Sequence, residues 1–181
     1  TMNFRGPILS VISFAILIVP VHLYAQNEII SRHTKIYYHN ENDLKLFNKR
    51  LKLGSLDYLL RHSPSNDSST SKEVAEKVDI ILERVRIILE IYPKNFKVEI
   101  RVLENPSEVQ RVYFDKYSKK VDFIAFYSRG DKTIYLAVDK IRSNILAHEL
   151  SHALIDHYFG AISPVKIHEI LAQYVDANFE D

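Results

Sequence analysis

The central part of the chain carries its clearest hydrophobic patterns. Apolar residues repeat every three or four positions from Val74 to Tyr92, and Pro93 ends the run, which predicts one long helix. The stretch Thr70–Glu73 has the sequence of a capping box and is expected to begin this helix. Residues 96–102 then alternate between apolar and charged side chains, a pattern typical of a half-buried strand.

Shorter patterns on either side predict further strands and helices. Residues 35–39 are rich in β-forming side chains, and Leu44, Phe47 and Leu51 lie at helical spacing within residues 43–53. The remaining expected elements are a short helix at 56–60, a serine-rich loop at 62–71, a helix that begins at Pro106, and a hairpin of residues 122–127 and 133–138.

Two more helices are expected near the C-terminal end. Residues 139–159 contain neither Pro nor Gly and are apolar nearly all round, as in a buried helix, and Gly160 would end it. The second helix should begin at Ser163, as N-cap, and Pro164, as first helical residue. Its expected packing face consists of Ile167, Ile170, Leu171, Tyr174 and Val175, and the adjoining stripe of Glu169, Ala172, Gln173 and Asp176.

The order of these elements indicates an α+β fold, because the strands are separated from the two C-terminal helices. The chain has 181 residues, enough for a single core. We expect a signal peptide at 1–25, a strand, short helices and a serine-rich loop at 26–70, and the main domain at 71–181.

The N-terminal stretch has the pattern of a secretory signal. Arg5 precedes an apolar run from Ile8 to Val19, Pro20 breaks the run, and Ala25 is the expected cleavage point. The chain is therefore expected to be exported to the periplasm or the extracellular space. The alternative is an uncleaved membrane anchor, because the apolar stretch is near the lower length for spanning a bilayer.

Composition narrows the classes of partner. The chain has 24 basic and 23 acidic residues, a net charge of +1, and no basic run with interleaved aromatic residues. Neither nucleic acid nor an acidic membrane surface is therefore the expected partner. The absence of cysteine excludes disulfides and thiolate ligands.

The stretch His148-Glu149-Leu150-Ser151-His152 matches H-E-x-x-H, the pattern of zinc hydrolases. Residues four apart lie on one face of a helix, so both imidazoles can point at one ion while Glu149 lies beside them. Zn²⁺ lowers the pKa of a bound water to about 7. Glu149 would take a proton from that water and later give one to the leaving amine. Glu169, on the following helix, is the expected third ligand.

Other residues near the motif fit a ligand role less well. Asp156 would lie about 12 Å along the helix axis from His148, too far to share an ion, and is expected to support a ligand or the helix. His157 is off the ligand face, and His168 ranks behind Glu169. The pattern should arise by chance only about 0.02 times in a chain of this composition, although a buried helix that happens to carry two histidines remains the alternative.

The sequences HELSHALID and HEILAQYVDANF resemble those of the gluzincin zinc peptidases, and most of all the secreted bacterial peptidase MA-like proteins. In that family a Glu on the following helix completes the metal site, as Glu169 would here. The chain has Ile170 where the family usually has Gly, and it contains no Trp. The resemblance implies a zincin-like fold, with a small twisted mixed sheet on the active-site helix and an edge strand that pairs with substrate. Thr133–Val138 is the expected edge strand.

The sequence therefore predicts a secreted zinc metallopeptidase with one Zn²⁺ per chain, a peptide or protein substrate and Glu149 as general base and acid. Tyr158, His157 and Tyr174 are candidate donors to the transition state, and Gln173 could brace a ligand. The chain ends shortly after Asp176, so a shallow, open site is expected. A second hypothesis is a metal-containing, zincin-like binding module of the cell envelope that cleaves nothing, and a third is a structural metal or a metal-free helix pair.

Overall fold

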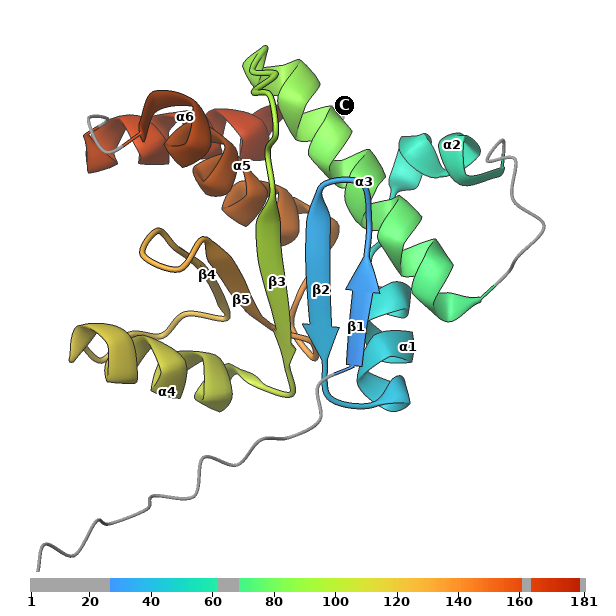
Figure 1. Ribbon diagram of the computed structural model, residues 1–181, viewed down its shortest axis with the longest axis horizontal. Coiled ribbons are helices and arrows are strands. Elements are labelled where there is room, and N and C mark those ends of the chain that lie inside the picture. The colour runs from blue at the N-terminus through green and yellow to red at the C-terminus, as the bar shows by residue number, and fades with distance from the viewer. Residues whose placement is uncertain (1–26, 62–68, 161–163, 180–181) are drawn as a thin grey trace, which may run out of the picture.

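The computed structural model describes residues 27–61, 69–160 and 164–179, which form an α+β fold with a five-stranded mixed sheet and six α-helices (Figure 1). The expected signal peptide, most of the serine-rich loop and the expected N-cap Ser163 lie outside these residues. Within the described ranges, no helix is long and apolar enough to cross a membrane.

The strands and helices follow one another in the expected order. The strands are β1 Asn27–Ile30, β2 Thr34–Tyr38, β3 Val98–Leu103, β4 Ala125–Ser128 and β5 Thr133–Ala137. The helices are α1 Glu41–Arg50, the 3₁₀ turn η1 Gly54–Leu56, α2 Asp57–Arg61, α3 Thr70–Leu89, α4 Pro106–Tyr117, α5 Ser143–Phe159 and α6 Val165–Asn178.

The sheet has the spatial order β1-β2-β3-β5-β4. Its three central strands, β2, β3 and β5, run parallel, while β1 and β4 pair antiparallel at the two edges. Strand β1 was not predicted. The expectation that Thr133–Val138 forms the edge is wrong, because β5 pairs on one side with β3 and on the other with β4. The free edge on this side of the sheet is β4.

Long helix α3 forms where the apolar repeat predicts it. Its buried side chains include Val78, Leu82 and Val85, spaced so that they lie on the face toward the sheet. The expected capping box is wrong, because the N-cap is Ser69 and no side chain closes the first turn. The helix ends when Glu90 takes up the left-handed conformation, with φ of 56°.

The sheet separates two apolar layers, and the alternation along β5 shows how. Ile134 and Leu136 belong to the main core, which the sheet shares with α1, α3, α5 and α6. Tyr135 and Ala137 point to the other face, where α4 covers them through Val109. Helix α5 therefore has the sheet on one side and α6 on another, which places its histidines at a junction of three elements (Figure 1).

Candidate metal site

Helix α5 brings His148 and His152 together as the i, i+4 spacing predicts. Their Nε2 atoms lie 3.2 Å apart, and their rings meet edge to face with centroids 4.8 Å apart. The helix begins at Ser143, later than expected, and Ser143 Oγ donates a hydrogen bond to the carbonyl of Lys52 at 2.6 Å. It ends at Phe159, and Gly160 follows with a positive φ of 65°, which glycine adopts without steric cost.

Helix α6 brings Glu169 to the same point. Its Oε1 lies 3.6 Å from Nε2 of His152. One donor atom from each of His148, His152 and Glu169 lies within 4.8 Å of the others, so this group could hold a metal ion. The Glu169 side chain is half exposed while that of His152 is nearly buried, so the group opens to solvent on the side of α6.

The packing face expected for α6 is largely wrong. Only Val175 of that face is fully buried, whereas Ile167, Ile170 and Tyr174 are 42%, 50% and 53% exposed. The helix instead packs through His168, Ala172 and Val175. The side chain of Ala172 has no exposed surface, which agrees with its expected role in close helix approach.

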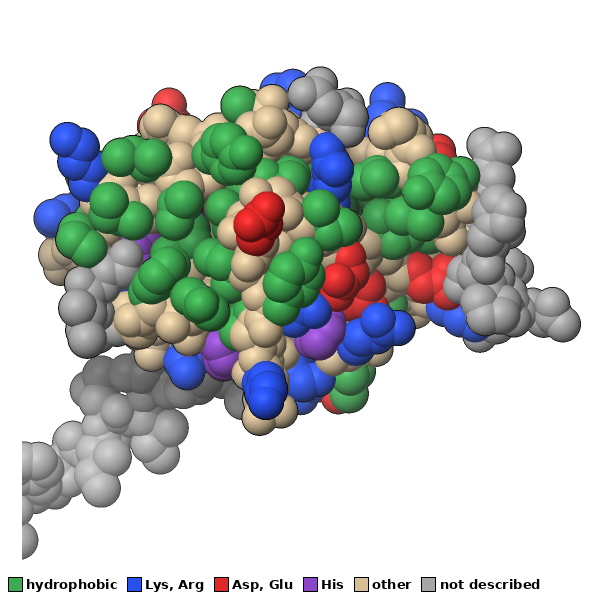
Figure 2. Space-filling model, turned by 90° about the horizontal axis from the view of Figure 1, so that it is seen from above, with side chains coloured by type: hydrophobic (Ala, Val, Ile, Leu, Met, Phe, Trp, Pro, Cys, Tyr) green, Lys and Arg blue, Asp and Glu red, His purple; other side chains and the backbone are tan. Residues whose placement is uncertain are grey.

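As a result, apolar side chains remain on the surface next to the candidate site. Figure 2 shows hydrophobic side chains gathered over this end of the molecule. The exposed large apolar residues of α5 and α6 are Tyr158, Phe159, Val165, Ile167, Ile170 and Tyr174.

A second carboxylate of α6 holds the first histidine. Asp176 Oδ2 lies 2.9 Å from Nδ1 of His148. When Nδ1–H donates to this carboxylate, Nε2 of the neutral ring is left as the acceptor that faces His152 and Glu169. Asp176 was expected in the same stripe as Glu169, but its contact with His148 was not predicted. Two turns of helix separate the two carboxylates, and each reaches one side of the histidine pair.

Glu149 is buried beside the triad rather than within it. Only 8% of the Glu149 residue surface is exposed to solvent. Burial raises the pKa of its carboxyl group to about 7, although the charge of His148 and a hydrogen bond from the backbone N–H of Tyr127 oppose this rise. The Tyr127 amide, on edge strand β4, therefore holds the Glu149 carboxylate from the side of the sheet.

His152 lies in surroundings that favour the neutral imidazole. Burial lowers its pKa to about 3, and the nearby charges of His148, His168 and Arg129 act in the same direction. The neutral ring is the form that can bind a metal. His152 is therefore neutral near pH 7.

An Arg-centred network backs the site on the far side of His152. Arg129, just after β4, contacts Asp156 through Nε at 2.5 Å and donates a hydrogen bond to Nε2 of His168 at 2.8 Å. Tyr127 donates to the other oxygen of Asp156 at 3.0 Å. His168 stacks on His152, with ring centroids 6.2 Å apart. The network therefore joins β4, α5 and α6 behind the histidine pair.

The other residues singled out from the sequence lie at varying distances from this group. Asp156 supports the helix junction through Arg129 and Tyr127, in line with the supporting role expected of it. Nε2 of His157 lies 3.3 Å from the carbonyl of Lys94. The remaining three are exposed: Tyr158 with its ring against Phe159, and Tyr174 and Gln173 on α6.

Sequence reasoning missed Arg129, Tyr127 and the buried role of His168. Each depends on contacts between residues far apart in the chain, and no local pattern indicates them. The one available signal was the adjacency of Arg129 to a predicted hairpin turn and of the hairpin to the motif helix.

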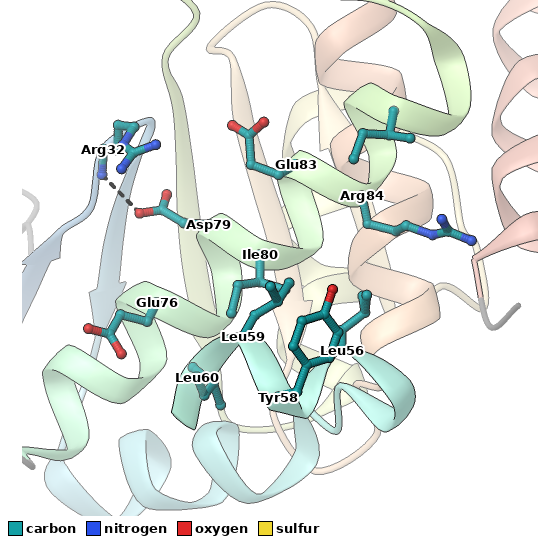
Figure 3. A pocket seen from close by; sticks show the side chains of 11 residues that line it. Arg32, Leu56, Tyr58, Leu59, Leu60, Glu76, Asp79, Ile80, Glu83 and Arg84 are labelled. Atoms are coloured by element: carbon teal, nitrogen blue, oxygen red, sulfur yellow. Dashed lines mark hydrogen bonds between the residues drawn. The ribbon is translucent and has the colours of Figure 1, made fainter. Parts of the chain in front are cut away.

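A hollow of about 560 Å³ lies elsewhere, between α2 and α3. Figure 3 shows Tyr58, Leu59 and Leu60 of α2 beside Ile80 of α3, with acidic side chains farther along α3. The hollow contains none of the triad residues. The volume of a hollow therefore does not identify the metal-binding group of this molecule.

Comparison of the chain with protein-family models, with curated proteins and with solved structures finds no match in any of the three. What is established for the site is its geometry: a His148, His152 and Glu169 group that could hold a metal ion, in an α+β fold.

Proposed function

We propose that the protein is a zinc-dependent metallopeptidase with a zincin-like arrangement of sheet and active-site helix. The observation that carries the proposal is the convergence of His148, His152 and Glu169 within 4.8 Å, with Glu149 buried directly beside them. Two imidazoles and one carboxylate form the ligand set of catalytic zinc sites that keep a fourth position open.

Two of the three donor-atom spacings are close to those around such an ion, and the third, between His148 and Glu169, lies within 4.8 Å. Zinc bonds to nitrogen and oxygen are about 2.0–2.2 Å long, so neighbouring donors of a tetrahedral site lie about 3.3–3.6 Å apart. The two Nε2 atoms are 3.2 Å apart, and His152 Nε2 is 3.6 Å from Glu169 Oε1. Asp176 would fix the tautomer of His148, the usual task of a carboxylate behind a metal-binding histidine.

Each residue of the site would have a separate role in the reaction. A zinc ion held by the triad would polarise the scissile carbonyl and lower the pKa of a water to about 7. Glu149 would accept a proton from the attacking water and pass one to the leaving amine. The backbone N–H of Tyr127 donates a hydrogen bond to the Glu149 carboxylate and so helps to orient it. Tyr158, His157 and Tyr174 remain candidate donors to the developing oxyanion.

Strand β4 supplies the place for an extended substrate. It is a sheet edge that pairs only with β5 among the described strands, and Tyr127 connects it to Glu149. A peptide that added itself to this edge would lie across the face of the histidine pair. The neighbouring strand, Thr133–Val138, was the one expected to have this role.

The decisive experiment measures zinc and turnover on the same preparations. Purified wild type should hold one Zn²⁺ per chain and Glu169→Ala should hold far less, while Glu104→Ala, which removes an exposed carboxylate after β3, should match wild type. Glu149→Gln should keep zinc and fold but lose about 10²–10⁴-fold in the cleavage of peptides that wild type cuts. Zinc retained in full by Glu169→Ala, or cleavage by Glu149→Gln at the wild-type rate, would contradict the proposal.

A second candidate function is a metal-containing binding module of the cell envelope. It is favoured by the exposed apolar side chains of α6, such as Ile170 and Tyr174, since patches of this kind commonly mark binding surfaces. Glu149 favours the peptidase, because a binding module does not need a buried carboxylate beside its metal ligands. Zinc binding without cleavage of any peptide in a broad proteome-derived set would favour the module.

We also propose that the protein acts outside the cytoplasm, on the basis of Arg5, the apolar run from Ile8 to Val19 and Ala25. N-terminal sequencing of the protein recovered from its native compartment tests this. A chain that begins near residue 26 is the expected result, and an intact apolar segment in the membrane fraction would indicate an anchor instead.

A further inference from the structure

A basic hollow lies beyond the histidine pair, at the C-terminal end of α5. Its volume is about 340 Å³, and it is lined by residues from the end of α5, from the β4–β5 hairpin and from the segment just before β3. Phe96 and Ala153 supply apolar wall, while Lys97, Arg129 and Lys132 supply positive charge. The only carboxylate among its lining residues is Asp156.

The positive charge of this hollow is not cancelled from within. Asp156 is already held by Arg129 and Tyr127, so the charges of Lys97 and Lys132 remain. Over the described residues, no carboxylate lies within ion-pair distance of either lysine. Lys97 uses one of its three N–H groups on the carbonyl of Arg32 at 2.6 Å.

The neighbouring acidic residue of the hairpin is engaged elsewhere. Asp131 contacts Lys116 at 2.6 Å and accepts a hydrogen bond from Tyr135 at 2.7 Å. Tyr135 belongs to the apolar layer that α4 covers. The carboxylate of Asp131 therefore does not neutralise Lys132, although the two residues are adjacent in the chain.

The hollow is joined to the candidate metal site by three of its residues. Tyr127 contacts Glu149 through its backbone N–H, and Arg129 reaches His168, whose ring stacks on His152. Asp156 lies one helical turn, or about 6 Å, beyond His152 along α5. An extended peptide advances about 3.3 Å per residue. About two residues of extended chain span that distance, so a substrate residue two or three positions from the scissile bond could reach the hollow.

We propose that this hollow, defined by Lys97, Arg129 and Lys132, binds a carboxylate of the substrate close to the bond that is cut. The inference rests on the proposed peptidase function for its location. The carboxylate is either the side chain of Asp or Glu or the C-terminal carboxylate of the peptide. Arg129, held in place by Asp156 and His168, shapes the wall of the subsite, and the two lysines supply its unpaired positive charge.

The test uses peptide binding by the zinc-loaded Glu149→Gln protein, so that ligands are held without being cut. The probes are short fluorescent peptides with blocked ends, in which a single Glu is moved along the sequence and compared with Gln at the same position. A second pair compares a free C-terminal carboxylate with its amide. Binding is followed by fluorescence anisotropy at low and high salt.

One of the two carboxylate-bearing series is expected to bind at least about tenfold tighter than its neutral partner, and the series that does so identifies the source of the carboxylate. The preference should shrink as salt rises. In the protein that also carries Lys97→Gln and Lys132→Gln, charged and neutral peptides should bind with affinities within about twofold of each other. The matched control, Lys119→Gln with Lys120→Gln, removes the same charge from exposed positions after α4 and should leave the preference unchanged.

Equal binding of charged and neutral peptides, or no binding of either, would overturn the inference, as would a preference that survives loss of both lysines. Cleavage by the Glu149-containing protein is measured separately on the same peptides. A failure of the peptidase proposal therefore shows as peptides that bind with the carboxylate preference but are never cut, which is a different result from loss of the preference.

Discussion

The geometry of the triad depends on how closely α6 approaches α5, and Ala172 controls that distance. Its side chain is completely buried, one turn from Glu169 and one turn from His168, on a helix that packs against α5. Helix axes approach to about 8–10 Å according to the size of the side chains at the contact. A larger residue at this position should push α6 outward and carry Glu169 away from the histidines.

Ala172→Leu is the sharpest perturbation of this contact. Overpacking a well-packed core typically costs about 1–3 kcal/mol. In a chain of this size each kcal/mol lowers Tm by about 2–4 °C, so Tm of the zinc-free protein should fall by about 2–12 °C. Metal ligands must lie within about 0.2 Å of their ideal distances. A displaced Glu169 should therefore weaken zinc binding by about tenfold or more, as loss of a supporting group does.

Ala177→Leu provides the matched control, because it makes the same chemical change on the same helix at an exposed position. Its effect on stability should stay within about 0.5 kcal/mol, and its zinc affinity should equal that of wild type. Thermal unfolding with and without zinc, together with competition against a chromophoric chelator, measures both quantities. Equal Tm and equal zinc affinity for Ala172→Leu and wild type would refute the packing of α6 described above.

Three further predictions concern charge and metal. A chelator should lower the Tm of wild type but not that of His148→Ala, because only the former has metal-binding free energy to lose; an equal shift in both would contradict a site at His148. Asp176→Ala should weaken zinc binding by about 10–100-fold, since the ring of His148 loses its partner, and competition with a chelator measures it. Burial favours the protonated form of Asp131, but hydrogen bonds led by that from Lys116 outweigh burial and lower the pKa of the carboxyl below its usual 3.8. Its contribution to stability is therefore present above that value and lost as pH falls through the lower folded value, so Asp131→Asn should flatten the acid side of a Tm-against-pH curve, and an unchanged curve would disprove the linkage.

The part of the site that could be predicted is the part encoded within one turn of helix. The spacing of His148 and His152 fixes their common face whatever surrounds them, and Glu169 follows on the next predicted helix. Regular repeats likewise identified α3 and β3, because each buries one face against a large core. Strand β1 escaped prediction, since its residues form neither a long nor a strictly alternating pattern.

The order of strands could not be predicted, for a topological reason. Residues 122–138 form the expected hairpin, but local sequence does not say which of its two strands enters the sheet. The connection from β3 through α4 leads to β4 first, yet β5 takes the place beside β3 and leaves β4 at the edge. All side chains of β5 are buried while Tyr127 of β4 is only partly so. This burial accords with a central and an edge strand, but it becomes visible only in the folded chain.

Helix α6 shows where hydrophobic patterning fails and why. Its apolar stripe predicts burial of Ile167, Ile170 and Tyr174, yet the helix buries His168 and leaves those three exposed. A buried imidazole is costly unless its polar atoms have partners, and Arg129 supplies one at 2.8 Å. Rotating the helix to bury the apolar stripe would break that contact and turn Glu169 and Asp176 away from the histidines. Local and global preferences conflict in this way mainly at functional sites, and the orientation of α6 is consistent with the metal site proposed above.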